Sequence, residues 1–188
     1  MTRTLVFGGA RSGKSAYAEK LARESGKEIV YIATAQAGDE EMTTRVRHHR
    51  AQRPAEWATL EEPLRLGDAI LREALPGRLL LVDCLTLWLT NLMFSSDETY
   101  PDVGDITLPE LFHSERAHLL YALAELGDTD CDLTLVSNEV GMGIVPYGAI
   151  SRCFTDEAGR LNQAVAAICD RAVFVAAGLP LHLKGGPC

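Results

Sequence analysis

The chain of 188 residues carries 26 acidic and 18 basic side chains, with a formal net charge of −8 and a pI of about 5.1. This acidic balance makes it a poor candidate for binding nucleic acid or an anionic membrane surface. Hydrophobic residues make up 47% of the chain, which fits a single α/β domain over residues 1–188 with a full-sized core.

Five cysteines are scattered along the chain without a C-x-x-C pair, at positions 84, 131, 153, 169 and 188. This spacing argues against a zinc site or a disulfide framework and predicts a reducing, cytoplasmic setting. The longest apolar run, residues 79–94, is interrupted by Asp83 and Asn91 and is too short to span a bilayer. Because the chain enters a strand and a glycine-rich turn at once, we expect no cleavable signal.

The first predicted elements are a short buried strand at residues 4–7 and a helix at 16–24, which lacks Gly and Pro. Between them the sequence reads G-x-x-x-x-G-K-S, the pattern of a P-loop. In this context backbone N–H groups and the positive end of a helix face one point, where they hold phosphates. Lys14 would reach the terminal phosphates and Ser15 would hold Mg²⁺. A chance match in a glycine-rich turn is the alternative, which the flanking strand and helix disfavour.

A second buried strand, residues 29–33, is β-branched and apolar and ends at Thr34, where α/β folds place ligand groups. A helix is then predicted from Asp39 to about Arg53; it has acid in its first turn and is stopped by Pro54. Its second half forms a cationic patch on an otherwise acidic chain, made by Arg45, Arg47, His48, His49, Arg50 and Arg53.

The next strand, residues 79–83, has four apolar residues that close on Asp83, which is the Walker B pattern. Asp83 would bind Mg²⁺ directly or through water; the alternative is an ordinary carboxylate at a strand end. A further strand, 132–137, runs into a tip at 138–143 that holds two glycines and a carboxylate. The remaining predicted elements are a strand at 57–60, helices at 64–74, 85–94, 108–126 and 155–170, a polar loop at 95–107, and strands at 172–176 and 179–183.

Strands that alternate with helices predict an α/β fold, a three-layer sandwich whose mostly parallel sheet is covered on both faces. The last two strands are joined at Gly178 by a link so short that only antiparallel pairing is possible.

The nucleotide could serve a molecular switch, an ATPase or a transferase. A GTPase switch would need N-K-x-D after a strand, whereas the tip reads N-E-V-G and the D-x-x-G match at 156–159 falls in a predicted helix.

On the predicted helix Arg45, His49 and Arg53 share one face, while His48 points about 100° away. A histidine flanked by guanidinium groups suits nucleophilic attack on an α-phosphate, because arginine binds phosphate oxygens in forked pairs. The product would be a phosphoramidate, a covalent intermediate that divides one transfer into two steps. The alternative is that these arginines only neutralise a triphosphate.

Together these motifs resemble one family from about residue 4 to residue 183. The chain is similar to the bifunctional adenosylcobinamide kinase / adenosylcobinamide-phosphate guanylyltransferases of cobalamin biosynthesis. The resemblance is carried by the P-loop, R-V-R-H-H-R-A-Q-R-P at 45–54, Trp57, Glu61, D-C-L-T at 83–86, Asn91, N-E-V-G-M-G-I-V-P at 138–146 and G-R-L-N-Q at 159–163.

The resemblance implies phosphorylation of the aminopropanol hydroxyl of adenosylcobinamide with ATP or GTP. It further implies transfer of GMP from GTP, through a guanylyl-histidine at His49, to give adenosylcobinamide-GDP and pyrophosphate. A RecA-like P-loop fold, a homotrimer and a cytoplasmic location are implied as well. The implied nucleotide contacts are Gly8, Gly9, Ala10, Arg11, Ser12, Gly13, Lys14, Ser15, Ala33, Thr34, Ala35, Arg50, Ala51, Gln52, Arg53, Glu61 and Asp83.

Two alternatives stay open: a single-activity P-loop kinase of a small alcohol, in which the histidines only bind phosphate, and a non-enzymatic nucleotide-binding module. The intact mass after incubation with GTP and Mg²⁺ separates them, because a guanylyltransferase alone gains a covalent GMP. We expect the corrinoid against the 138–143 tip and the 160–163 segment, with a neighbouring subunit completing the site.

Overall fold

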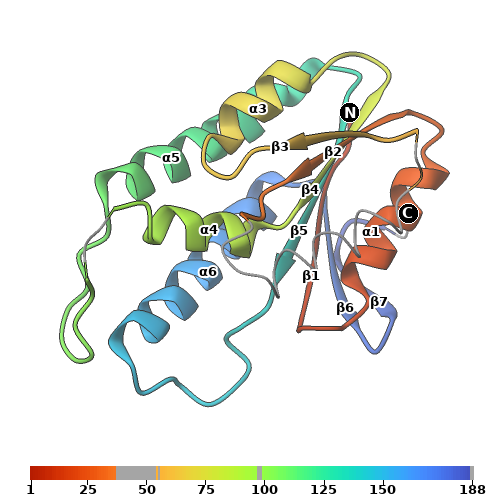
Figure 1. Ribbon diagram of the computed structural model, residues 1–188. Helices are drawn as coiled ribbons and strands as arrows, with labels where there is room; N and C mark the ends of the chain where they lie inside the picture. Colours follow the sequence, from red (N-terminus) through yellow and green to blue (C-terminus); the bar gives the residue numbers. More distant parts are fainter. Residues whose placement is uncertain (37–53, 55, 97–98, 187–188) are drawn as a thin grey trace.

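A single twisted sheet organises the computed structural model, which describes residues 1–36, 54, 56–96 and 99–186 (Figure 1). The strand order is β3-β2-β4-β5-β1-β6-β7, and each neighbouring pair is parallel except the last, which is antiparallel. The mostly parallel sheet and the antiparallel ending are therefore confirmed. The strands are β1 (Arg3–Gly8), β2 (Glu28–Ala33), β3 (Ala58–Glu61), β4 (Arg78–Asp83), β5 (Asp132–Asn138), β6 (Arg171–Ala176) and β7 (Leu179–Lys184).

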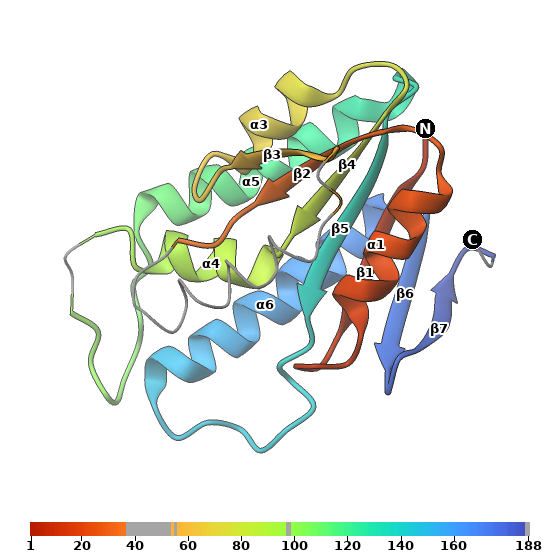
Figure 2. The same ribbon diagram turned by 45° about the vertical axis from the view of Figure 1, so that its right-hand side comes forward.

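Helices cover both faces of this sheet, so the predicted three-layer sandwich is also confirmed. One face packs against α3 (Leu66–Glu73), α4 (Leu85–Met93), α5 (Glu110–Glu125) and α6 (Ala149–Ile168), and the other packs against α1 (Lys14–Glu24) (Figures 1 and 2). A short 3₁₀ helix, Leu126–Asp128, follows α5. No helix within the described part of the chain is long and apolar enough to cross a membrane.

The two faces follow from the period-two alternation of strand side chains. On β4, Leu80 and Val82 join the core under α3 to α6, whereas Leu79 and Leu81 join the core under α1. Both sets are apolar because a central parallel strand is buried on each side. Polar side chains of β4 are thereby confined to its ends, where Asp83 stands.

Most predicted elements appear within a residue or two of their expected bounds, but helix α6 does not. It begins at Ala149, whereas the sequence predicted a start at Thr155. The added stretch reads A-I-S-R-C-F, and its Ile150 and Phe154 are partly buried against the core, so tertiary packing supports the helix there. The predicted helix at 39–53 lies outside the described residues.

Helices α3 and α5 approach closely at Gly67. A Cβ built on Gly67 would lie 2.6 Å from His118 Cδ2 and 3.1 Å from the His118 carbonyl oxygen. The backbone of α5 therefore occupies the space that a side chain would need, and only glycine fits this crossing.

We expect Gly67→Ala to lower the free energy of unfolding by about 1–3 kcal/mol, because overpacking outweighs the gain in helix propensity. The matched control is Gly159→Ala on α6, where an added Cβ meets nothing within 4 Å. That change should stabilise the protein by up to about 1 kcal/mol. Urea unfolding of both variants measures the difference, and equal stabilities would contradict the close crossing.

Candidate nucleotide-binding site

The predicted P-loop has the strand–turn–helix geometry that its sequence requires. Strand β1 ends at Gly8, and α1 begins at Lys14 after a turn in which Arg11 and Gly13 have positive φ values of 56° and 94°. The Lys14 ammonium donates a hydrogen bond to the Gly9 carbonyl at 3.2 Å, so this side chain folds back over the loop. The loop N–H groups, the start of α1 and the lysine charge together define a phosphate site.

The turn between β6 and β7 braces this loop from the side. The Gly178 N–H donates to the Ser12 carbonyl at 2.8 Å. A Cβ on Gly13 would lie 3.0 Å from Gly178 Cα, and a Cβ on Gly8 would lie 2.2 Å from the Val175 carbonyl oxygen. Both P-loop glycines are therefore required by packing against the hairpin as well as by approach to phosphate.

Asp83 stands at the carboxyl end of β4 on the face that α1 covers. Alternation places Tyr31, Leu81 and Asp83 on this same face, and β2 pairs Tyr31 with Leu81 and Ala33 with Asp83. The buried Tyr31 hydroxyl donates to Asp83 Oδ2 at 2.9 Å. One carboxylate oxygen is thus fixed by a tyrosine, which orients the group at the strand end.

Thr34 joins the ends of β2 and β4. Its hydroxyl donates to the Cys84 carbonyl at 2.8 Å and accepts the Cys84 N–H at 2.9 Å. The Asn91 side chain on α4 donates to the carbonyls of Thr34 and Pro63, at 2.7 and 3.0 Å. These bonds satisfy polar groups that are buried beside the site and hold Asp83 in place.

The Cys84 thiol follows Asp83 directly in the chain and is buried. Burial, with a smaller effect of the Asp83 carboxylate, raises the pKa of Cys84 to about 11, although Lys14 opposes the shift. The thiol also contacts the Thr86 hydroxyl at 3.1 Å, and this hydroxyl accepts a hydrogen bond from Asn138 at 2.6 Å. Burial and a raised pKa keep the Cys84 thiol protonated and of low reactivity near neutral pH.

The predicted site residues that the structure describes gather at one edge of the sheet. The P-loop, Ala33, Asp83 and Glu61 all lie at the carboxyl ends of strands, and Ala33 is paired in register with both acidic residues. Thr34 and Ala35 follow directly after β2. His49, Arg50, Ala51, Gln52 and Arg53 lie outside the described residues, so their placement stays a prediction.

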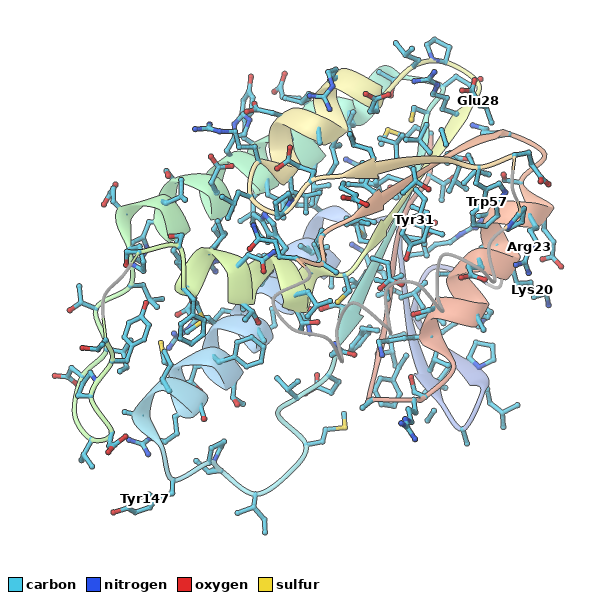
Figure 3. The ribbon with its side chains drawn as sticks, viewed as in Figure 1. Lys20, Arg23, Glu28, Tyr31, Trp57 and Tyr147 are labelled. Atoms are coloured by element: carbon cyan, nitrogen blue, oxygen red, sulfur yellow. The ribbon has the colours of Figure 1, made fainter. Side chains whose placement is uncertain are left out.

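Sequence reasoning missed Tyr31 and did not explain Trp57. The strand register could have revealed Tyr31. It lies on the neighbouring strand β2 and on the same face of the sheet as Asp83, two residues before Ala33, which pairs with Asp83. Trp57, which precedes β3, lies under the Arg23 guanidinium, 5.7 Å from the ring centroid, and so ties this edge to α1 (Figure 3).

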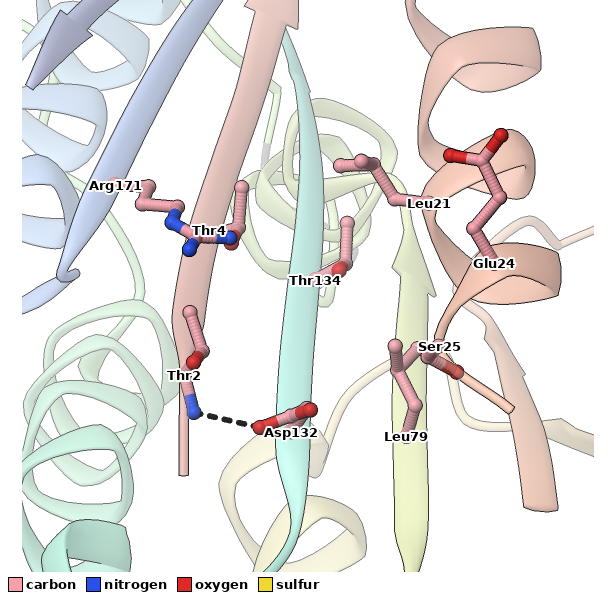
Figure 4. A pocket seen from close by; sticks show the side chains of 9 residues that line it. All are labelled: Thr2, Thr4, Leu21, Glu24, Ser25, Leu79, Asp132, Thr134 and Arg171. Atoms are coloured by element: carbon pink, nitrogen blue, oxygen red, sulfur yellow. Dashed lines mark hydrogen bonds between the residues drawn. The ribbon is translucent and has the colours of Figure 1, made fainter. Parts of the chain in front are cut away.

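Away from the P-loop, a hollow of about 220 Å³ lies at the opposite edge of the sheet, beside the end of α1 (Figure 4). Of its two acidic residues, Glu24 and Asp132, the latter accepts the Thr2 N–H at 2.6 Å and pairs with Lys27 at 3.1 Å. Ligands of open α/β sheets bind at the carboxyl ends of the strands, so this hollow is not the nucleotide site.

The fold and the P-loop define a P-loop nucleotide-binding protein. Solved structures with a similar fold include an ATP synthase subunit, NeqB, from Nanoarcheaum equitans, at TM-score 0.57 and 13% identity, covering 93% of this chain and 45% of that one. Another is the type III secretion ATPase EscN of enteropathogenic E. coli, at TM-score 0.55 and 17% identity, covering 94% and 43%. At these identities the likeness concerns the fold alone.

A family model described as cobinamide kinase / cobinamide phosphate guanyltransferase matches residues 4–183. The bifunctional adenosylcobalamin biosynthesis protein CobP of Pseudomonas aeruginosa is 54% identical over 98% of this chain and 99% of its own. The corresponding CobU protein of Escherichia coli K12 is 39% identical over 96% and 98%. The chain belongs to the cobinamide kinase / cobinamide phosphate guanyltransferase family.

The raised pKa of Cys84 leads to a labelling prediction. At pH 8 a thiol with a pKa of about 11 is ionised to about one part in a thousand, and the thiolate is the reactive form. Iodoacetamide should therefore leave Cys84 intact in the folded protein and alkylate it in urea. Peptide mass spectrometry measures this, with the partly exposed Cys153 as internal comparison. Rapid alkylation of Cys84 at pH 8 would contradict the burial argument.

Proposed function

We propose that this chain phosphorylates the aminopropanol hydroxyl of adenosylcobinamide with ATP or GTP, and then transfers GMP from GTP onto that phosphate. The observation that carries the proposal is the convergence of the P-loop, Lys14 and Asp83 at one edge of the sheet, in a member of this family. A phosphate cradle with a lysine and an oriented carboxylate is the equipment that phosphoryl transfer needs.

In the first reaction the substrate hydroxyl oxygen attacks the γ-phosphorus, the bond to the bridging oxygen breaks, and the nucleoside diphosphate leaves. The hydroxyl proton is released in the same step. The loop N–H groups and Lys14 bind the phosphate oxygens and stabilise the charge that develops on them. Catalysis here rests on positioning and charge, and no protein nucleophile is required.

Mg²⁺ is the cation that fits the donors of this site. Ser15 offers a half-buried hydroxyl in the first turn of α1. The hydrogen bond from Tyr31 uses Oδ2 of Asp83, so Oδ1 is the carboxylate oxygen that would bind the ion. Within the described residues no cluster of three His, Cys, Asp or Glu side chains could hold a metal alone. Ser15 and Asp83 would hold the ion together with the triphosphate, whose charge it neutralises.

In the second reaction a nitrogen of His49 attacks the α-phosphorus of GTP, and pyrophosphate leaves. The guanylyl-histidine is a phosphoramidate. An oxygen of adenosylcobinamide phosphate then attacks the same phosphorus, the P–N bond breaks, and the histidine is restored. This role rests on the sequence, in which His49 precedes Arg50 in the basic segment that the family resemblance singles out.

We also propose that the chain acts in the cytoplasm as a homotrimer. Leu179, Leu181 and Leu183 are 58–71% exposed on β7, which is an edge strand of the sheet. Regularly spaced exposed leucines on an edge strand favour a surface that another subunit covers.

Asp83→Asn should raise the Mg²⁺ concentration needed for half-maximal kinase activity by tenfold or more, because an amide is a weaker ligand. Tyr31→Phe should cause a smaller increase, since it removes the hydrogen bond that orients the carboxylate but leaves the carboxylate itself in place. Tyr121→Phe, at an exposed position on α5, is the matched control. Mg²⁺ titrations at saturating ATP measure the effect, and an unchanged requirement in Asp83→Asn would remove Asp83 from the site.

The two activities should separate by mutation. His49→Ala should abolish the covalent GMP adduct and the guanylyltransferase step while kinase activity survives, because phosphoryl transfer needs no histidine. Lys14→Ala should lose kinase activity by about 10²-fold or more and bind triphosphate weakly. Intact mass after incubation with GTP and Mg²⁺ and a kinase assay with adenosylcobinamide measure both effects.

His48→Ala is the control and should keep the adduct, which should be stable to base and labile to acid, as a phosphoramidate is. An adduct that persists in His49→Ala would overturn the assignment. Wild-type protein that phosphorylates adenosylcobinamide but gains no GMP would instead be a single-activity kinase.

A further inference from the structure

A groove of about 560 Å³ lies between the loop that follows β5 and helix α6. Its volume is within the range of about 300–1,000 Å³ that ligand sites occupy. Figure 2 shows the loop passing below the carboxyl ends of the strands before the chain enters α6. The groove brings together the two segments that the sequence suggested as walls, the 138–143 tip and residues 160–163, through Val140, Gly141, Gly143, Arg160 and Gln163.

The groove begins at the rim of the phosphate site. The Glu139 N–H donates to the Gly8 carbonyl at 2.9 Å, and Gly8 is the first residue of the P-loop. The next residue, Val140, already lines the groove. A molecule bound there would have one end beside the phosphates.

Hydrogen bonds hold the groove open. The Ser137 hydroxyl donates to Asn162 Oδ1 at 2.6 Å, and Asn162 Nδ2 donates to the Asn138 carbonyl at 3.2 Å, which fixes α6 to the end of β5. At the far end the Arg152 guanidinium donates to the carbonyls of Pro146 and Tyr147. The loop is therefore tied to α6 at both ends.

The loop wall is apolar and exposed. Ile144 is 98% exposed and Val145 is 75% exposed, and Tyr147 beside them points away from the body of the protein (Figure 3). Burying an aliphatic side chain of this size against a ligand is favourable, because it removes apolar surface from water. Adjacent exposed aliphatic groups on a hydrogen-bonded loop mark a surface that an apolar ligand covers.

The helix wall is polar, with a gap in its middle. Thr155, Gly159 and Gln163 recur on one face of α6 and offer a hydroxyl and a carboxamide to the groove. A glycine inside a helix is less stable than an alanine at the same position. Gly159 nevertheless stands in the middle of α6, and a Cβ there would meet nothing within 4 Å. The missing side chain keeps the groove clear.

We propose that this groove binds the corrin macrocycle of the substrate, an inference that rests on the function proposed above. A corrin ring presents broad apolar faces and an edge of carboxamide side chains. Its apolar face would cover Ile144 and Val145, while the carboxamides would exchange hydrogen bonds with Thr155 and Gln163. The aminopropanol arm would then extend past Val140 toward the P-loop, where its hydroxyl is phosphorylated.

Filling the groove from Gly159 tests this assignment without harming the helix. Gly159→Leu should weaken binding of cobinamide at least tenfold, measured by equilibrium dialysis and corrin absorbance, while Gly159→Ala should have a smaller effect. Val145→Asp should weaken binding to a similar degree by placing charge against the ring. Thermal unfolding of Gly159→Leu should not begin at a lower temperature than in wild type, because leucine favours the helix more than glycine does.

The matched control is Leu75→Asp, a half-exposed position at the opposite end of β4, which should bind cobinamide as wild type does. Wild-type affinity in both Gly159→Leu and Val145→Asp would overturn the groove while leaving the proposed function intact. A change of oligomeric state in these variants without loss of cobinamide affinity would also overturn it, because the occupant would then be a second copy of the chain. A wild-type protein that neither binds nor phosphorylates cobinamide would overturn the proposed function itself.

Discussion

Apolar packing on both faces of the sheet is the constraint on which the site depends. The alternating side chains of the inner strands pack into two separate cores, so the charged side chains of these strands stand at the strand ends. Parallel strands bring several carboxyl ends to one edge, and there Gly8, Ala33, Asp83 and Asn138 come together. Strand β5 lies between β1 and β4. The P-loop and Asp83 therefore follow strands that are not hydrogen-bonded to each other, and one strand separates them.

Side chains alone do not shape this edge, because backbone contacts from distant parts of the chain fix it. The β6–β7 turn has positive φ values at Ala177 and Gly178, 51° and 78°, and this tight turn delivers an N–H to the Ser12 carbonyl. The antiparallel hairpin at the end of the chain thus supports the loop near its beginning. Thr34, Tyr31 and Asn91 do the same for Asp83. Thr34 and Tyr31 are buried, so the same contacts that hydrogen-bond their polar groups also orient the edge of the sheet.

The sequence indicated the parts of this arrangement that are local. The P-loop, the acid that closes β4 and the antiparallel final strands are readable because each depends on neighbours within a few residues. The hydrogen bonds from Tyr31 to Asp83 and from Gly178 to Ser12 join residues that are distant in the chain, so no local sequence pattern predicts them. The early start of α6 was missed for a related reason, since its first turn is helical through packing of Ile150 and Phe154 rather than through periodicity. The sequence suggested the 138–143 tip and residues 160–163 as walls of one site, but the part of the wall made by residues 144–146 appears only when α6 lies beside the loop.

The two proposed transfers attack different phosphorus atoms, the γ-phosphorus in the kinase step and the α-phosphorus of GTP in the second. The proposed covalent histidine would let pyrophosphate leave before the second acceptor arrives. The acceptor in both proposed reactions is the same arm of the same large molecule, first as a hydroxyl and then as a phosphate. A groove that begins at Gly8 and is held open by Asn162 and Arg152 would keep the bulk of that molecule in one place while the arm is used twice. Binding the bulk of a large substrate away from the reacting atoms supplies binding energy that positions the arm. This positioning of the reacting groups accelerates the transfer.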